Sequence, residues 1–352
     1  MSHPFATDWL DDRLPFARLG CPGFGASVRA RARSRKDLQW RREAASEHEA
    51  STLNYASNAS STRKEVNMVR LTAERLVLRI TVGASPKRQS DSLAGEEPLE
   101  LRVGGRSLAV TMRTPGADFD LAAGFLVSEG VLTRPEELSA MRYCARATDG
   151  LNRYNLLDLT LASGVAPPDD SVARAFFTTS SCGLCGKASI DAVRTRSAFE
   201  VRDDPLRVTP ALLASLPERL RSAQKLFEKT GGLHAAALFD GETGELFVLR
   251  EDVGRHNAVD KVVGWALREG RLPLRGTVLL VSGRASFELV QKAVMAGIPM
   301  LCAVSAPSSL AVDLAEEAGM TLVGFLRDPS MVVYAGEERL LAAEAPAGTR
   351  TP

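Results

Sequence analysis

Two cysteines separated by two residues, Cys182 and Cys185, are the side chains of this chain best suited to covalent chemistry. Small and hydroxyl residues precede them, and Gly186-Lys187 and a helix-like run from Ala188 follow. A cysteine at a helix N-terminus feels the positive end of the helix dipole, and Lys187 adds a positive charge nearby, so the thiolate is favoured over the thiol. The thiolate is the nucleophilic form, and we therefore expect sulfur chemistry at this loop.

The CxxC spacing by itself is compatible with several kinds of site. Such a pair can supply half of a zinc site, exchange disulfides, transfer sulfur, or pack as two inert thiols. A structural zinc site normally needs four ligands, but Cys21, Cys144 and Cys302 are isolated in the sequence. His234 and His256 are also not paired at ligand spacing. The spacing alone leaves all four possibilities open.

The overall composition is that of an ordinary globular protein. The chain has 352 residues, of which 45% are apolar and 25% charged, and its length suggests about two domains. A net charge of +1 gives no global attraction to nucleic acid or to a membrane surface. No apolar run approaches the roughly 20 residues of a membrane span, and no secretory pattern is visible. Five cysteines are few for this length, so we expect a reducing, cytoplasmic location.

Residues 1–68 differ in composition from the rest of the chain. An arginine-rich run covers residues 29–36, and a Ser-, Asn- and Ala-rich stretch with weak apolar periodicity covers residues 46–62. Such sequence buries too little surface to offset its chain entropy, so we predict a disordered extension. A nucleic-acid-binding arm is the alternative, which the interspersed acidic residues weaken. We expect the functional chain to start near Met68.

Residues 69–170 are predicted to form a smaller, β-rich α+β domain. Two runs in which apolar and polar residues alternate flank Gly104-Gly105, a pattern that is typical of a hairpin. Asp118 or Asp120 is the expected N-cap of a helix that ends near Gly130. The predicted strands cover residues 76–82, 99–103, 107–112 and 154–161.

Residues 171–345 are predicted to form an α/β domain that carries the CxxC loop. Its last part alternates buried strands with helices, a βαβαβ pattern that implies parallel strands and right-handed crossovers. Before this unit we predict a helical stretch, a hairpin and a second helix, whose expected N-cap is Asn257. The predicted strands of the βαβαβ unit cover residues 277–281, 299–304 and 321–325, and its helices cover residues 287–296 and 310–318.

Polar turns follow the carboxyl ends of these strands, where ligands of such sheets bind. The turn at Ser282, Gly283 and Arg284 presents backbone N–H groups and a guanidinium at a helix start, which suits phosphate; a plain turn with a surface arginine fits equally well. Arg255 and His256 repeat the pattern at another helix start, although a lone histidine is more often structural. Together these turns suggest a phosphate-bearing ligand near one sheet edge.

Five motifs occur in an order that matches one protein family. They are Asp120 to Gly130, Ser181 to Lys187, Thr230 to His234, Glu251 to Lys261, and Val281 to Arg284. In these motifs the chain resembles the FdhD family of sulfur carriers, accessory proteins of formate dehydrogenase. The resemblance covers about residues 69–345 and leaves residues 1–67 outside it.

The resemblance implies a cytidine-deaminase-like fold with a mostly parallel sheet for the main domain. It also implies a sulfurtransferase, in which Cys182 takes persulfide sulfur from a cysteine desulfurase and Cys185 assists. The sulfur then passes to the molybdenum cofactor, in its bis(molybdopterin guanine dinucleotide) form, before that cofactor enters formate dehydrogenase. GDP is expected to mimic the nucleotide half of the cofactor. No permanently bound metal is expected, and members of the family are generally homodimers.

Two groups of residues are candidates for the cofactor site. By match of position, the resemblance implies the segment Phe325, Leu326, Arg327, Asp328, Pro329 and Ser330. From the residues themselves we infer that Ser282, Gly283, Arg284, Arg255 and His256 also contribute.

Two other functions remain as alternatives. A zinc-dependent nucleoside deaminase pairs its CxxC with an upstream HxE motif, but neither His234 nor His256 begins such a motif. A cofactor-binding chaperone with inert cysteines is the non-catalytic alternative.

Overall fold

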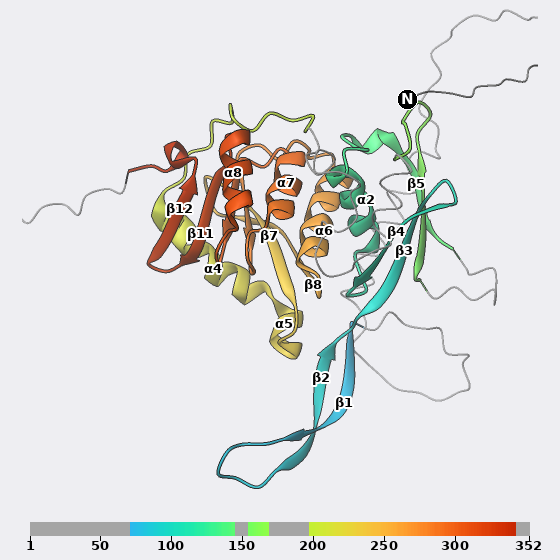
Figure 1. The fold of residues 1–352 in the computed structure, drawn as a ribbon, viewed down its shortest axis with the longest axis vertical. Helices are drawn as coiled ribbons and strands as arrows, with labels where there is room; N and C mark the ends of the chain where they lie inside the picture. Colours follow the sequence, from blue (N-terminus) through green and yellow to red (C-terminus); the bar gives the residue numbers. More distant parts are fainter. Residues whose placement is uncertain (1–70, 145–153, 169–196, 343–352) are drawn as a thin grey trace, which may run out of the picture. The chain divides into compact units, whose positions relative to one another are not determined.

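The computed structural model describes residues 71–144, 154–168 and 197–342 (Figure 1). These residues form a two-stranded hairpin, a four-stranded sheet and a six-stranded sheet, with helices packed on the larger sheet. The predicted extension 1–68, the predicted domain boundary at residue 170 and the CxxC loop lie outside the described residues.

The six-stranded sheet has the order β12-β11-β10-β9-β7-β8. Its three central strands β9, β10 and β11 are parallel, so the predicted βαβαβ unit is confirmed. The prediction of a mostly parallel sheet is wrong, because the three other neighbouring pairs are antiparallel. Short turns after β7 and β11 return the chain directly to a neighbouring position, which only antiparallel strands allow. The strands are β7 His234–Asp240, β8 Leu246–Asp252, β9 Thr277–Val281, β10 Met300–Ala303, β11 Thr321–Arg327 and β12 Ser330–Ala335.

The two faces of this sheet are covered by different helices, because successive strand residues point to opposite sides. Leu279 and Val281 of β9 pack in the core beneath α6, α7 and α8, whereas Val278 and Leu280 pack in a second core beneath α4. Cys302 belongs to this second core and is fully buried, as predicted. The helices are α4 Pro210–Ala223, α5 Lys225–Thr230, α6 Arg255–Arg268, α7 Phe287–Met295 and α8 Ser309–Ala318.

The four-stranded sheet has the order β4-β3-β6-β5. The predicted hairpin across Gly104-Gly105 is confirmed as β3 and β4, and the predicted strand at 154–161 is confirmed as β6. Helix α2, Asp118–Ser128, follows β4, but its N-cap is Ala117 in a left-handed conformation and neither predicted aspartate. The strands are β3 Glu97–Val103, β4 Arg106–Arg113, β5 Leu138–Tyr143 and β6 Leu156–Leu161; short 3-10 helices cover Pro135–Glu137 and Glu337–Arg339.

Helices α2 and α6 cross in close contact at a pair of glycines. A Cβ atom added to Gly124 would lie 1.8 Å from the carbonyl oxygen of Asp260, and one added to Gly264 would lie 1.8 Å from that of Asp120. Only glycine allows the two backbones to approach this closely. The crossing fixes where α6 lies, and therefore where Arg255 and His256 at its N-terminus lie.

The remaining strands form a hairpin that extends away from both sheets (Figure 1). β1, Thr72–Arg79, pairs with β2, Lys87–Ala94, in continuous antiparallel register. The strand predicted at 76–82 is confirmed in part, since β1 begins and ends earlier. The polar sequence of β2 gave no strand signal.

Candidate functional site

Several loops meet at one edge of the six-stranded sheet. β8, β9, β10 and β11 all end at this edge, and β7 begins there with His234, because β7 runs antiparallel to β8 and β9. Three of these strand ends lead directly into the N-termini of α6, α7 and α8. The topology thus brings together turns that are far apart in the sequence.

Hydrogen bonds join these loops. Ala285 of the loop after β9 donates its N–H to the carbonyl of Ala306 (3.2 Å) and accepts from the N–H of Ser308 (3.0 Å) in the loop after β10. Phe325 in β11 donates its N–H to the carbonyl of Ser305 (3.1 Å). The predicted site residues 282–284 and 325–330 are therefore held by one continuous framework.

Helices α6 and α7 both begin at this edge without a side-chain cap. The N-cap of α7 is Ser286, a residue type that often caps helices, but its hydroxyl lies 3.5 Å from Nε2 of His256. By contrast, Ser308 caps α8 by accepting from the N–H of Ala311. The first N–H groups of a helix have no partner within the helix, so α6 and α7 offer donors and positive dipole ends to an anion.

His256, in the first turn of α6, is a neutral imidazole at physiological pH. Burial lowers its pKa to about 3, and the positive charges of Lys292 and Arg255 contribute. Besides Ser286, its Nε2 faces a carboxylate oxygen of Glu288 at 3.9 Å. A neutral imidazole can both donate and accept hydrogen bonds.

His234 lies beside the turn after β9. A Cβ atom added to Gly283 would lie 3.4 Å from Nδ1 of His234, so the imidazole is close to the glycine backbone. Burial, and then the charge of Arg255, lowers the pKa of His234. Ser282 fixes the adjoining backbone, since it donates its N–H to the carbonyl of Ala235 and accepts from the N–H of Ala235 through its hydroxyl, both at 2.9 Å.

The positive charge of Arg255 acts on both histidines. Its Nε is buried and has no hydrogen-bond partner within the described residues. Leaving a buried N–H donor without a hydrogen bond costs folding free energy, so this group is suited to a hydrogen bond with a ligand. Arg284 is exposed at the same edge.

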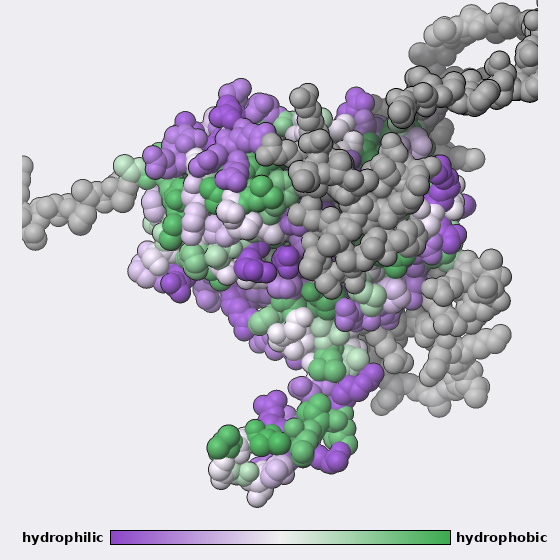
Figure 2. Space-filling view, in the orientation of Figure 1, coloured by the Kyte–Doolittle hydropathy of each residue, from purple (hydrophilic) through white to green (hydrophobic). Residues whose placement is uncertain are grey.

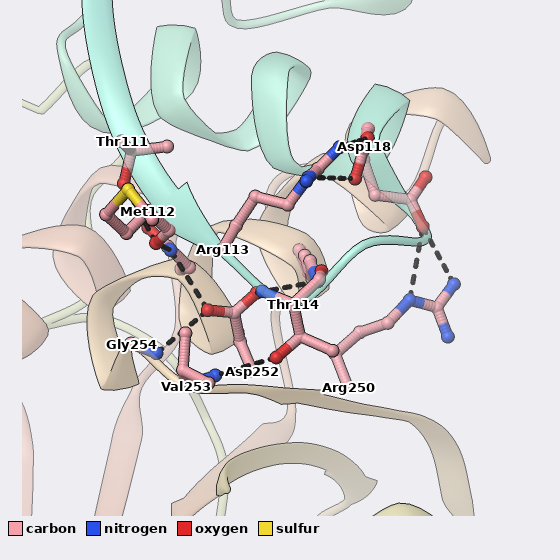
Figure 3. Close-up of polar contacts among 12 residues, drawn as sticks. Thr111, Met112, Arg113, Thr114, Asp118, Arg250, Asp252, Val253 and Gly254 are labelled. Atoms are coloured by element: carbon pink, nitrogen blue, oxygen red, sulfur yellow. Dashed lines mark hydrogen bonds and ion pairs between the residues drawn. The ribbon is translucent and has the colours of Figure 1, made fainter. Parts of the chain in front are cut away.

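Asp252, the last residue of β8, anchors the turn that leads into α6 (Figure 3). Its carboxylate accepts from the N–H of Gly254 (2.8 Å) and from the N–H of Thr114 (3.1 Å). Thr114 returns a bond, because its hydroxyl accepts from the N–H of Val253 (3.2 Å). The end of β4 is therefore tied to the start of α6.

The charge of Asp252 is balanced inside the protein. Lys261 lies in the second turn of α6. Its Nζ is 2.7 Å from the carboxylate of Asp252, and both side chains are almost fully buried. Nδ2 of Asn257 also donates to Asp252 (3.0 Å) and to the carbonyl of Met112 (2.8 Å). Asn257 was predicted as the N-cap of α6, but Gly254 holds that position and the Asn257 side chain points into this network.

The predicted segment 325–330 spans the end of β11, the turn and the first residue of β12. Phe325 has a positive φ of 50° and is 38% exposed, an unusual conformation for a bulky residue that places its ring at the surface. Arg327, Asp328, Pro329 and Ser330 are exposed. Leu326 differs, because its side chain is fully buried in the core and only its backbone can meet a ligand.

Cys182 and Cys185 lie outside the described residues. Within residues 71–144, 154–168 and 197–342, no group of three or more His, Cys, Asp and Glu side chains is arranged to hold a metal ion.

Some residues of this edge were not predicted as site residues. In the sequence, His234 stood out only as a histidine without a partner at ligand spacing and as the last residue of one family motif, and Ser286 was not singled out. The antiparallel position of β7 brings His234 to the edge, and a single sequence does not show strand order. Glu288 carries no sequence signal at all.

Comparison with known proteins identifies the family. The model of the FdhD/NarQ family matches residues 94–341. The chain belongs to this family. A protein of Streptomyces avermitilis named sulfur carrier protein FdhD is 64% identical over 282 residues, which cover 80% of this chain and 99% of that protein. The protein of the same name from Mycolicibacterium paratuberculosis is 59% identical over 273 residues, covering 77% of this chain and 100% of that protein.

A solved structure supports the fold. It is described as that of a formate dehydrogenase accessory protein from Desulfotalea psychrophila, and it matches with a TM-score of 0.62 and 24% sequence identity. The match covers 77% of this chain and all of the other. The cytidine-deaminase-like assignment stays a prediction. In the described part of the chain, no helix has the length and apolar character to span a membrane.

Proposed function

We propose that this FdhD/NarQ family member is a sulfurtransferase that serves formate dehydrogenase. It takes sulfur from a cysteine desulfurase on Cys182 and delivers it to the molybdenum cofactor. The names of its relatives as sulfur carriers, at up to 64% identity over nearly their whole length, support the carrier role. The CxxC pair supplies the residue types that this chemistry needs.

The first step is a transfer between two thiols. The Cys182 thiolate attacks the terminal sulfur of the desulfurase persulfide, the S–S bond of the donor breaks, and the donor cysteine leaves as a thiolate. Cys182 then carries the persulfide, and no net oxidation or reduction occurs. Cys185 assists or relays the sulfur at the same loop.

The acceptor is proposed to bind at the described sheet edge. The nucleotide arms of bis(molybdopterin guanine dinucleotide) carry pyrophosphate groups, and the uncapped N-termini of α6 and α7 beside Arg255 suit such groups. This arrangement is the observation that carries the binding part of the proposal. Because His256 is neutral, it adds a hydrogen-bond partner without adding charge.

The segment from Phe325 to Ser330 extends the proposed site along the same edge. The exposed Phe325 ring offers a flat apolar surface for a planar ring system, and Arg327 and Ser330 offer polar contacts. The hydrogen bond from Phe325 to Ser305 fixes the backbone next to this ring.

Titration with GDP tests the binding site. Replacing Arg255 by Gln removes the positive charge at the start of α6, and we expect the GDP dissociation constant to rise about tenfold or more. The control is Arg275→Gln, an exposed arginine that precedes β9 and lies at the opposite sheet edge. Equal GDP affinity of wild type and Arg255→Gln would contradict the proposed site.

Complementation separates sulfur transfer from a chaperone with inert cysteines. In a strain that lacks this gene, Cys182→Ala is expected to leave formate dehydrogenase inactive while GDP binding by the purified variant is retained. Full formate dehydrogenase activity with Cys182→Ala would leave only the chaperone role.

A further inference from the structure

Glu288, in the first turn of α7, has a carboxylate to which no group in the described part of the chain donates a hydrogen bond. One of its oxygens lies 3.9 Å from Nε2 of His256, which is beyond hydrogen-bonding distance. The His256 imidazole is neutral at physiological pH, so the two side chains do not form an ion pair. Lys292, one turn further along α7, donates instead to both oxygens of Asp260, at 2.8 Å each. Both oxygens of Glu288 are therefore available to a ligand.

The partial burial of Glu288 distinguishes it from the other carboxylates near this edge. Its side chain is 15% exposed, so the carboxylate has lost much of its water but can still be reached. The oxygens of Asp252, by contrast, are occupied by the N–H groups of Gly254 and Thr114 and by Lys261. A partly desolvated carboxylate without donors gains more from a ligand N–H group than an exposed carboxylate does.

The first turns of α6 and α7 differ in charge. Helix α6 begins with Arg255 and has no acidic residue in its first turn, whereas α7 has Glu288 there. A phosphate is attracted by Arg255 and repelled by Glu288. The phosphate of a nucleotide therefore fits the start of α6, and the start of α7 suits a part of the ligand that donates hydrogen bonds.

The start of α7 also offers hydrogen-bond donors. The N–H groups of Phe287 and Glu288 have no acceptor within the described residues, and the hydroxyl of Ser286 does not cap the helix. Donors thus lie next to a carboxylate acceptor. One edge of guanine carries the complementary groups, since its carbonyl oxygen is followed by a ring N–H and a 2-amino group. Adenine has an amino group and then a ring nitrogen acceptor, whose lone pair is repelled by a carboxylate.

We propose that Glu288 is a specificity-determining residue of the candidate site, whose carboxylate accepts hydrogen bonds from the ring N–H and 2-amino groups of a guanine-type ring edge. The inference rests on the proposed function, because it names the part of the ligand that α7 recognises. The pterin rings of the cofactor carry the same three groups in the same order, so guanine and pterin share this chemistry. Hydrophilic and hydrophobic residues are interspersed over the described surface of the body (Figure 2), so individual hydrogen bonds select the ring.

Calorimetric titration of the full chain with nucleoside diphosphates tests the inference. Inosine diphosphate (IDP) lacks the 2-amino group of GDP, and ADP reverses the donor and acceptor pattern. We expect the wild type to bind GDP about tenfold or more tightly than IDP, and to bind ADP no better than IDP. In Glu288→Gln an amide NH₂ group replaces one carboxylate oxygen and faces the donors of guanine. The ratio of the IDP and GDP dissociation constants should then fall to within about twofold of one.

Three further arms identify the group that Glu288 recognises. Glu242→Gln removes an exposed carboxylate from the β7–β8 turn at the opposite sheet edge, and it should keep the wild-type ratio. Titration with 2′-deoxy-GDP separates base from ribose, and a loss of preference for GDP over 2′-deoxy-GDP in Glu288→Gln, with the GDP to IDP preference intact, would overturn the inference. Lumazine has an oxygen in place of the 2-amino group of pterin. A Glu288-dependent preference for pterin over lumazine, without one for GDP over IDP, assigns the carboxylate to the pterin end of the cofactor.

A purely structural role of Glu288 would weaken the binding of all these ligands equally and leave both ratios unchanged. A wild type that binds IDP as tightly as GDP, and lumazine as tightly as pterin, overturns the inference whether or not the variant folds. If GDP binding depends on Arg255 but neither ratio depends on Glu288, the inference fails and the proposed binding site stands. A wild type that does not bind GDP at all contradicts both.

Discussion

Asp252 shows how one buried side chain sets the geometry of the candidate site. It receives hydrogen bonds from Thr114 just after β4, from its own turn and from α6, and Lys261 neutralises its charge. The sequence motif around Asp252 indicated chemistry at this turn, but it did not distinguish a ligand-contacting residue from a positioning one. The structure places Asp252 in the second group, since its oxygens are already occupied.

Replacing Asp252 by Asn is expected to lower the free energy of unfolding by about 3–5 kcal/mol, because Lys261 is left as an unpaired charge in the interior. Urea unfolding measures this cost. Adding Lys261→Met to Asp252→Asn should restore part of the loss, because the uncompensated ammonium is gone. A cost of Asp252→Asn below about 1 kcal/mol would show that the pair is not coupled as described.

The depressed pKa of His256 predicts how stability depends on pH. The unfolded chain binds a proton near the ordinary pKa of 6.5, whereas the folded chain does so only near about 3. Between these values the unfolded state binds more protons, so acidification destabilises the fold, by about 2 kcal/mol from pH 7 to pH 5 for this group. His256→Asn should therefore lose less stability than the wild type over this range. An equal loss in thermal or urea unfolding would mean that His256 titrates normally in the folded protein.

At the scale of elements, the periodicity of apolar residues predicted the strands that pack in a core. It missed the strand that forms only by pairing with a neighbouring strand. β3, β4, β6 and the βαβαβ strands were recognised because their side chains alternate or are uniformly apolar. β2 was missed because its polar sequence becomes a strand only through pairing with β1. The N-caps of α2 and α6 were predicted wrongly, because Ala117 and Gly254 hold these positions and neither caps its helix with a side chain, the signal on which the prediction was based.

The α2–α6 crossing makes a prediction at this scale. Gly124→Ala would place a methyl group against the backbone of Asp260, with no flexible side chain to move aside, so we expect a loss of at least about 3 kcal/mol of unfolding free energy. Gly232→Ala is the control, because nothing lies closer than 3.9 Å to a Cβ atom there. Similar unfolding midpoints for the two variants would argue against the close crossing.

For the whole molecule, the sequence predicted that the turns after the parallel strands meet at one edge, but it did not show which other elements join them there. Parallel strands were expected to bring Ser282 and Phe325 to one edge, and the described sheet does so. Because β7 runs antiparallel to β9, it brings His234 to the same edge. This placement follows from the strand order, which a single sequence does not show. The proposed function therefore combines a candidate binding edge in the described residues with a CxxC loop outside them.

Mass spectrometry of the protein after incubation with a cysteine desulfurase and cysteine tests this account most directly. We predict the mass increment of one sulfur atom on the peptide that contains Cys182, removable by a thiol reductant. Cys302 is the internal control, because burial raises the pKa of its thiol and the core excludes the donor, so its peptide should stay unmodified. An unmodified Cys182 peptide, after transfer conditions under which the desulfurase itself carries the persulfide, would contradict the account.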